Sequence, residues 1–532
     1  MNFKLRSLVA ATLAGSMLMG FGTSAMADST DDILNALIAK GILTEEEGAL
    51  LQKGRTGEKE AAAEKKKTAV SIKNKDGAMV LETGDGKNSM AVTGRLHFDA
   101  RSVNTNSTAE NSTTLMDKDS TSLANNFEIR RARVGVKGKM FEHFDYEVIG
   151  NLVGSNTNNI DVAYVNAGMF KQAQVKIGQF KQPFNLEEYG TSSNNIDFME
   201  RSYVNQLSPA KKPGFMLHGV PTNGLTYAAS VYQQNTFGEV DARNDDKGIV
   251  GRVTGNLAEL AGWKDSVLHL GAAGFETQYG VTPTTSSSGG TATAATIVNF
   301  RTEGRGIANA YRAQIGGTVA GTDGFSAPSP DTALLKNKAY GLEVAGAYGP
   351  FKIQGEFTDQ KFDAEAAGNI ASLDAKAYYV EALWMLTGEN YSDWYKNGAW
   401  GGIKPKSNFD VETGKGKGAW EVGVRFDEYK VDNVAYSGAA GSSTTNLNRV
   451  QGSNAGSVNS SGVTNAADYT PTGSSGGAKT YTVGIKWQLT PNMRMLANYS
   501  HTKFDDAFTV ADTSVAGVSK EDLLMVRTQF SF

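Results

Sequence analysis

The sequence predicts an all-β protein, a transmembrane barrel of 16 antiparallel strands behind a short N-terminal helical segment. Three observations support this prediction. From Met90 to the C-terminus, polar and apolar residues alternate with a period of two, which is typical of strands with one lipid face and one polar face. The segments between these strands alternate between long and short. After the N-terminal region, no stretch contains the ~20 consecutive apolar residues of a spanning helix.

Residues 1–27 have the pattern of a secretory signal peptide. Lys4 and Arg6 precede a short apolar run, and Ala25-Met-Ala27 is a small-x-small cleavage site. The alternative is a membrane anchor, but the apolar run is shorter than a spanning helix requires. Cleavage removes two cations and no acid, so the formal net charge changes from −4 to −6. An exported protein with this acidic balance is not expected to bind nucleic acid.

Residues 28–68 are predicted to form a periplasmic helical segment. A capping box of Thr44 and Glu47 starts its second helix, which we expect Gly54 and Gly57 to interrupt. The segment is either a short coiled coil or a solvated linker, because its apolar seam is too short to specify an oligomer.

Residues 69–89 are predicted to be a linker or a small hairpin that turns at Asp76-Gly77. The barrel domain then occupies residues 90–532. Its predicted strands are 90–101, 127–140, 143–153, 158–167, 173–180, 213–220, 223–234, 247–257, 265–277, 338–348, 351–361, 374–387, 417–430, 478–489, 493–504 and 521–532.

The connections between the predicted strands have a regular parity. Odd-numbered strands are followed by long segments, except at 154–157, and even-numbered strands by tight turns such as 349–350 and 490–492. If both chain ends lie in the periplasm, the long loops all face outward, as in outer-membrane barrels. A soluble β-sandwich gives no reason for this parity. The connection 388–416 is long on the periplasmic side, and the pattern does not explain it.

The third outward loop, residues 181–212, is expected to fold back into the barrel and narrow the pore. Acids and bases are balanced in it, so two roles stay open. Charges of both signs would set up a transverse field across the constriction, or Glu200 and Arg201 would anchor the loop to the wall. The charged residues predicted for the constriction are Lys181, Glu187, Glu188, Asp197, Glu200 and Arg201.

The polar face of the strands predicts a lumen that carries many cations. Four of them, from Arg131 to Lys139, lie on one strand with no acid on the same face until Glu147 on the next strand. Guanidinium groups suit phosphate because their planar fork matches two oxygens. The alternative is that cations pair with acids across the ladder and brace the wall. The predicted pore-lining cations are Arg95, Arg101, Arg131, Arg133, Lys137, Lys139, Arg252, Arg425, Lys486, Arg494 and Arg527.

Several segments, in their order along the chain, resemble the phosphate-selective porin O and P family. The resemblance implies a trimeric outer-membrane porin of 16 strands whose third loop folds inward, with basic, anion-specific pores in some members. The matching segments are 40–47 (KGILTEEE), 127–133 (FEIRRAR), 175–184 (VKIGQFKQPF), 198–201 (FMER), 349–351 (GPF), 386–389 (LTGE), 404–406 (KPK) and 418–421 (GAWE).

The sequence therefore predicts a passive channel for small hydrophilic solutes in the outer membrane of a Gram-negative-type bacterium. Its expected partners are outer-membrane lipid, two further copies of the chain, and small anions such as phosphate. Whether selectivity is for phosphate, for anions in general or absent stays open. The alternative is a structural protein that tethers the envelope through its N-terminal helices. An enzyme is not expected, because the five histidines are scattered and no metal, nucleotide or haem motif occurs, so no cofactor is expected either.

Overall fold

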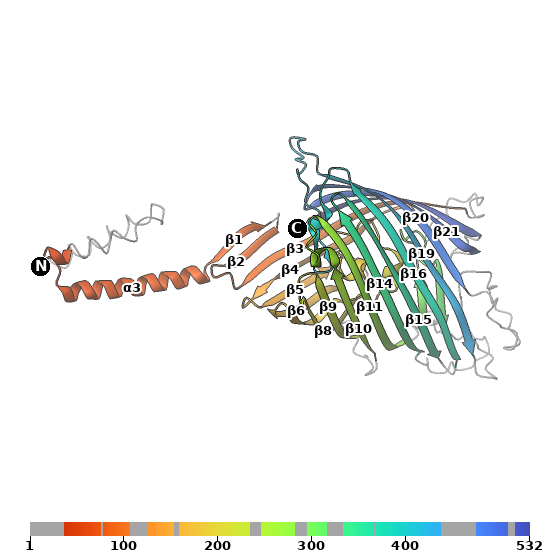
Figure 1. Cartoon of the computed structure of the whole chain (residues 1–532), viewed down its shortest axis with the longest axis horizontal. Helices are drawn as coiled ribbons and strands as arrows, with labels where there is room; N and C mark the ends of the chain where they lie inside the picture. The colour runs from red at the N-terminus through yellow and green to blue at the C-terminus, as the bar shows by residue number, and fades with distance from the viewer. Residues whose placement is uncertain are drawn as a thin grey trace, which may run out of the picture. The chain divides into compact units, whose positions relative to one another are not determined.

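The computed structural model describes residues 37–75, 78–106, 125–153, 159–234, 246–281, 295–315, 333–366, 369–437, 475–508 and 517–532. The predicted signal peptide lies outside the described residues. The main sheet has 18 strands, of which β1 and β2 form an N-terminal hairpin and the other 16 form a closed antiparallel barrel. Figure 1 shows the strongly tilted barrel strands side by side.

The barrel confirms the predicted fold class and strand number. Each strand pairs with the next, and β22 pairs with β3 to close the sheet. The barrel strands are β3 (Ser89–Thr105), β4 (Asn126–Met140), β5 (Phe144–Asn151), β6 (Ile160–Phe170), β7 (Ala173–Lys181), β8 (Lys211–Gly219), β9 (Leu225–Gln233), β10 (Lys247–Asn256), β11 (Ser266–Val281), β14 (Ala333–Tyr348), β15 (Phe351–Ala366), β16 (Asn369–Met385), β19 (Ala419–Ser437), β20 (Gly476–Thr490), β21 (Met493–Phe508) and β22 (Val518–Ser531).

Several strands from β11 onward extend further outward than the sequence predicts. The strand β14, for example, begins at Ala333 rather than at residue 338. In these outer strand ends, the residues that point away from the lumen are charged, such as Lys336 and Lys338. The apolar alternation therefore stops before the hydrogen-bonded ladder does. These strands thus continue beyond the apolar band that the sequence pattern detects.

The helix α3 (Glu45–Thr68) belongs to a compact unit of its own, whose described residues are 37–71 and 83–86. The predicted capping box is present, with Thr44 Oγ1 accepting from the Glu47 N–H at 3.2 Å. The helix continues through Gly54 and Gly57, so the predicted interruption was wrong. A glycine costs only ~1 kcal/mol relative to alanine, and acids in the first turn and lysines in the last turn favour a long helix. No described helix is long and apolar enough to cross a membrane.

A hairpin precedes the barrel. The strands β1 (Val70–Lys75) and β2 (Ala78–Thr83) pair with each other, and β2 also pairs with the start of β3 through Val80 and Ala91. The turn residues 76–77 lie outside the part of the chain that the structure describes.

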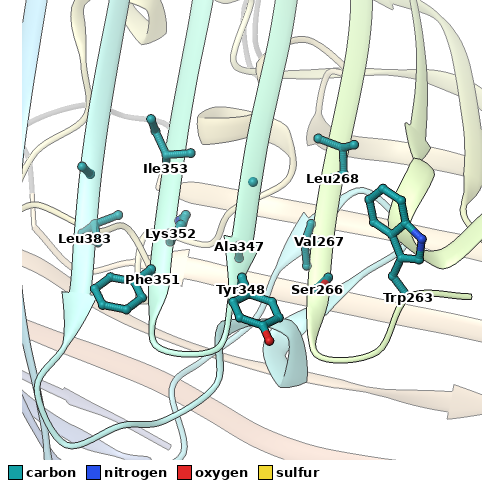
Figure 2. A pocket seen from close by; sticks show the side chains of 12 residues that line it. Trp263, Ser266, Val267, Leu268, Ala347, Tyr348, Phe351, Lys352, Ile353 and Leu383 are labelled. Carbon is teal, nitrogen blue, oxygen red and sulfur yellow. The ribbon is translucent and has the colours of Figure 1, made fainter. Parts of the chain in front are cut away.

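Aromatic side chains mark the periplasmic edge of the apolar band on the barrel's outer face. Tyr348 is 72% exposed beside the turn from β14 to β15, and Figure 2 shows it next to Phe351. Phe351 stacks on Trp384 of the neighbouring strand, with ring centroids 5.9 Å apart. Amphipathic and aromatic rings favour this level of a membrane.

Tyrosines mark the outer edge of the same band. Tyr340 and Tyr499 each donate a hydrogen bond to a carboxylate on the next strand, Asp359 at 3.1 Å and Asp522 at 2.6 Å. From Tyr340 to Tyr348, a strand tilted by ~40° climbs ~20 Å, close to the ~25 Å band of outer-membrane barrels.

Three connecting segments fold into the barrel. They are the third loop, the hairpin of β12 (Ala295–Phe300) and β13 (Tyr311–Ile315), and the periplasmic connection after β16. That connection holds η4 (Tyr391–Trp394), β17 (Tyr395–Lys396) and β18 (Ala399–Trp400), so its unexplained length corresponds to an inserted structure.

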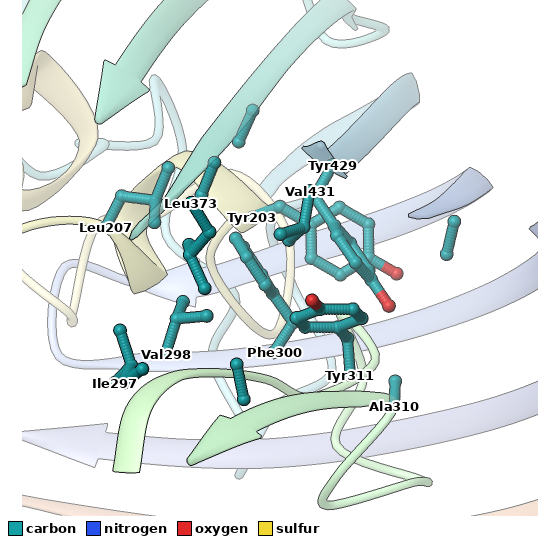
Figure 3. Close-up of a cluster of buried hydrophobic side chains, with 14 of the residues drawn as sticks. Tyr203, Leu207, Ile297, Val298, Phe300, Ala310, Tyr311, Leu373, Tyr429 and Val431 are labelled. Atoms are coloured by element: carbon teal, nitrogen blue, oxygen red, sulfur yellow. The ribbon is translucent and has the colours of Figure 1, made fainter. Parts of the chain in front are cut away.

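The interior of the barrel therefore contains a hydrophobic core. The largest cluster joins the third loop, the β12–β13 hairpin and the wall, and Figure 3 shows its aromatic rings in contact. Phe300 stacks on Tyr429 at 4.2 Å, and Tyr203 meets Tyr429 edge-on at 4.8 Å. Such packing holds the inserted segments in fixed positions.

Candidate pore and its constriction

The third loop leaves the wall after β7 and crosses the lumen. It contains the π-helix η3 (Asn185–Tyr189) and the short helix α4 (Tyr203–Gln206). Its apolar side chains are fully buried: Phe184 packs against β9–β14, Leu186 against β14 and β16, and Met199 against β21 and β22. The loop therefore rests on several walls of the barrel and not on one neighbouring strand.

Carboxylates of the wall hold the backbone of this loop. Glu356 on β15 accepts the N–H groups of Leu186 at 2.6 Å and Glu187 at 2.8 Å. Asp427 on β19 accepts the Tyr203 N–H at 2.7 Å. Because these N–H groups are buried, the wall carboxylates satisfy donors that water does not reach.

The loop's own acids bind cations of the wall. Glu200 accepts from Arg130 on β4 at 2.8 Å and from Arg527 on β22 at 2.8 Å. Asp197 pairs with Lys352 at 2.6 Å and lies 3.7 Å from Lys486. Burial and these lysines act oppositely on Asp197, and the lysines prevail, so its pKa lies below the usual range.

A buried guanidinium on β19 joins two of the inserted segments. Arg425 pairs with Glu187 of the third loop at 3.3 Å and with Glu303, which follows β12. The same side chain donates to the Glu200 carbonyl oxygen at 2.9 Å and lies over the Phe198 ring at 4.6 Å. Arg425 is therefore a strut between the wall and both segments.

The periplasmic connection after β16, with η4, β17 and β18, contacts the third loop from the periplasmic side. The Trp400 N–H donates to the Gly190 carbonyl at 2.9 Å, and its indole N–H donates to Gln354 on β15 at 2.7 Å. The Lys352 ammonium lies over the Trp400 ring at 4.3 Å, and Arg252 donates to the Gly398 carbonyl at 3.2 Å. The constriction is thus built from two sides.

The inserted segments divide the lumen surface into two parts. We call the lumen face of β10 to β22 the covered wall, because the inserted segments pack on it; it includes the outward part of β3 from His97 and the outward part of β4 up to Arg131. We call the lumen face of β5 to β8, with the rest of β3 and β4, the open wall. On the covered wall, Arg252 and Arg425 have side chains that are 3% and 0% exposed. At the open wall, Lys181 and Lys211 remain 20% and 21% exposed.

Five cations gather where the third loop meets the open wall. We call them the basic cluster: Arg95, Arg133, Lys181, Arg201 and Lys211. They lie close enough to influence one another electrostatically.

Three acids act on the basic cluster: Asp161, Glu188 and, at Arg95, Glu147. Asp161 pairs with Arg133 at 2.9 Å and with Lys211, and Glu188 pairs with Arg201 at 3.0 Å and Lys181 at 3.9 Å. Burial would raise the pKa of Glu188, but Arg201 and Lys181 lower it to about 2. Glu188 is therefore ionised, and the cluster keeps more positive than negative groups.

The sequence profile of the family "Phosphate-selective porin O and P" matches residues 93–532. The chain belongs to this family. Porin O of Pseudomonas aeruginosa is 28% identical over 317 residues, which is 57% of this chain and 67% of that protein. The protein is therefore an outer-membrane porin, located in the outer membrane of a Gram-negative bacterium. The family is one of channels rather than enzymes.

Solved outer-membrane proteins are similar to the chain at low TM-scores and low identity. A loop-deletion form of OmpT of Vibrio cholerae has a TM-score of 0.44 and 10% identity, covering 84% of this chain and 100% of its own. The channel DcaP of Acinetobacter baumannii has a TM-score of 0.43 and 9% identity, covering 84% and 97%. The strand pairing of this porin, not these scores, defines its barrel.

Some of the pore-lining cations predicted from the sequence lie on the open wall, and the others lie on the covered wall. On the open wall, Arg133 and Lys139 pair with Asp161 and with Asp145 (3.6 Å), while Lys137 is exposed. The four cations predicted on β4 therefore do have acids near them besides Glu147, because Asp161 lies beside Arg133 and Asp145 beside Lys139. Arg95 donates to Ser193 of the third loop at 2.6 Å.

The remaining predicted cations of the porin are buried behind the inserted segments. Their partners, in parentheses, are as follows: Arg101 (Glu128, and Asp99 at 3.7 Å), Arg131 (Glu200, 3.9 Å), Arg252 (Glu343, 2.7 Å), Arg425 (Glu303 and Glu187), Lys486 (Glu421, 2.6 Å), Arg494 (Gln529, 3.0 Å) and Arg527 (Asp99, 2.6 Å).

Two functional residues depend on β-bulges that the sequence analysis did not detect. His97 pairs with Arg131 and Phe98 with Ile129, so Arg130 is an extra residue in β4. Asp161 is the extra residue in β6. Both side chains consequently turn into the lumen, out of phase with simple alternation. The adjacent Arg130-Arg131 pair within an alternating strand was the available signal.

Proposed function

We propose that this porin passes small anions in preference to cations, along a path between the open wall and the third loop. The observation that carries the proposal is the basic cluster, in which five cations face three acids, Asp161, Glu188 and Glu147, and keep partial exposure. A row of weak, incompletely neutralised sites lets an ion enter and still leave. The covered wall contributes little, because its charges are buried and most of its cations are paired with acids; Arg494, whose side-chain partner is Gln529, is an exception.

Phosphate is the anion class that the family description suggests, and two features of the cluster support it. Arg95 and Arg133 supply guanidinium forks, which fit two oxygens at once, and Lys181 and Lys211 supply point charges. The third loop then acts both as an anchor, through Glu200, and as one side of the constriction, through Lys181 and Arg201. The porin works as a homotrimer and without chemical catalysis in this proposal.

A planar-bilayer reversal potential under a salt gradient tests the proposal. Removing one charge ~7 Å from the permeating ion changes its energy by ~0.6 kcal/mol in water, which is about threefold in permeability. Arg133→Ala and Lys181→Ala should each lower the chloride-to-potassium permeability ratio by about that factor. Phosphate should block chloride current in the wild type and less so in Arg133→Ala.

The matched control is Lys361→Ala, which removes an exposed cation from the outer face of the barrel. It should leave the permeability ratio unchanged. A cation-selective wild-type channel would overturn the anion proposal, and so would equal ratios in all four proteins.

A further inference from the structure

A groove of 720 Å³ runs over the lipid-facing surface of β7 to β14. Its floor consists of small residues on three adjacent strands, since Ala229 is opposite Gly251 and Gly251 is opposite Gly274. No atom lies within 4 Å of the place where a Cβ on Gly251 would stand. The groove is therefore a real trough and not a row of flush side chains.

The walls of the trough are apolar along most of its length. Val175, Phe215, Leu217, Val231 and Ile249 line it, and four of them are about half exposed or more. Such an exposed apolar surface is ordinary on a barrel inside a membrane, but the indentation is not filled by the protein itself.

The trough crosses the membrane obliquely. Leu217 lies near the periplasmic end of β8, whereas Glu276 and Lys338 lie on the outer parts of β11 and β14. The trough covers six strands, and five spacings of ~4.8 Å give a length of ~24 Å across the strands. One leaflet contributes about half of a ~30 Å hydrocarbon core, so the outer part of the trough, toward Glu276 and Lys338, can hold one acyl chain of the outer leaflet.

Lysines gather at the outer end of this trough. Lys247 on β10 and Lys336 on β14 flank Gln278 in one row, and Lys338 lies in the row below. Lys338 is 3.8 Å from Glu276, and the nearby Asp363 pairs with Lys361 at 3.7 Å. Among the described residues, neither Lys247 nor Lys336 makes an ion pair, although Asp363 lies opposite Lys336 on β15; both lysines are exposed.

We infer that the trough binds one phosphate-bearing lipid of the outer leaflet. An acyl chain lies over Ala229, Gly251 and Gly274, and a headgroup phosphate lies between Lys247 and Lys336. Free phosphate would gain no binding energy from the apolar floor, so the apolar length of the trough favours a lipid over free phosphate. The unpaired lysines at one end separate it from an uncharged lipid and favour a polyanionic headgroup.

Native mass spectrometry of the full-length porin with diphosphoryl lipid A tests this inference. The wild type should retain one lipid A per chain. Gly251→Phe places a ring in the trough from a position whose Cβ meets no other atom, and it should weaken lipid A binding at least tenfold. Lys247→Ala with Lys336→Ala should weaken binding of lipid A but not of its dephosphorylated form.

Gly346→Phe is the matched control. Gly346 lies in a second lipid-facing groove of 540 Å³ near the periplasmic turns, visible in Figure 2, and the nearest atom to its Cβ position is 3.5 Å away. The lysine among the lining residues, Lys352, points into the lumen and pairs with Asp197. Lipid A binding should therefore persist in Gly346→Phe.

Three results would overturn the inference. Lipid A could remain bound equally well to Gly251→Phe, inorganic phosphate could displace it completely, or Gly251→Phe could dissociate the oligomer, which would make the trough a subunit contact. Reversal potentials of both glycine variants should equal that of the wild type, so this test is independent of the anion proposal.

Discussion

The open wall and the covered wall carry the same kinds of charged residue in different surroundings. On the covered wall, Arg252 meets Glu343 in a bidentate pair at 2.8 and 2.7 Å, with side chains 3% and 1% exposed. At the open wall, Lys139 and Asp145 are 3.6 Å apart and about half exposed. Desolvation makes the first pair a structural requirement, whereas water and salt screen the second.

The difference separates stability from selectivity. A buried charge whose partner is removed costs several kcal/mol, so the covered wall can hold the inserted segments only while its pairs are complete. An exposed charge costs little to change, and it acts on whatever ion passes close to it. Substitutions on the two walls should therefore change different measurements.

The largest effect is expected for Arg425→Ala on the covered wall. This change leaves Glu187 and Glu303 buried without their guanidinium partner, and it releases the Glu200 carbonyl. We expect a loss of ~3–5 kcal/mol in the free energy of unfolding, measured by denaturant titration in detergent. Channel noise should also rise, because the third loop and the β12–β13 hairpin lose a shared strut.

Arg133→Ala is the comparison variant for Arg425→Ala. Its side chain is 14% exposed, and its partner Asp161 keeps Lys211 as a second cation, so the loss should stay near ~1 kcal/mol. If Arg133→Ala destabilises the porin as much as Arg425→Ala does, the division into two walls is wrong.

Sequence alone was sufficient for the barrel because strand alternation and loop parity are local properties of the chain. Tyr481, Val483 and Ile485 face lipid as their alternation predicts. Loop parity also placed the third loop on the outer side. The bulges at Arg130 and Asp161 escaped detection because one extra residue changes which face a side chain takes without changing composition.

The division of the lumen into an open wall and a covered wall could not be predicted from the sequence, for a different reason. Arg133 and Arg425 both lie on lumen faces, and alternation treats them alike. Only the inserted segments decide which of them is buried, and the insertion at 388–416 depends on contacts such as Trp400 with Gly190, 210 residues apart in the chain. Such long-range packing has no periodic signal.

An intermediate effect is expected from Glu188 of the third loop. Its pKa is lowered to about 2 in the folded porin, so its pairing stabilises the loop at pH above its ordinary value of 4.5 and is lost as the pH falls toward 2. The contribution of Glu188 to selectivity should be constant from pH 5 to pH 8.

Glu188→Gln reproduces the low-pH state at neutral pH. Lys181 and Arg201 then lose their shared acid, and the chloride-to-potassium permeability ratio should rise about threefold for one removed negative charge. The measurement is a reversal potential at pH 7, with the wild type at the same pH as the reference. A lower ratio in Glu188→Gln would show that this acid organises the basic cluster rather than offsetting it.

The smallest effect is expected at Lys139, near the periplasmic end of the open wall. Its pair with Asp145 is exposed, so Lys139→Ala should change the free energy of unfolding by less than ~0.5 kcal/mol.

Lys486→Ala is the matched change on the covered wall, where the ammonium lies 2.6 Å from Glu421 in a dry environment, and it should cost several kcal/mol. Raising the salt concentration from 0.1 to 1 M shortens the screening length from ~10 to ~3 Å, which should remove the Lys139 effect and leave the Lys486 effect largely intact. Equal salt dependence of the two variants would mean that water reaches both walls.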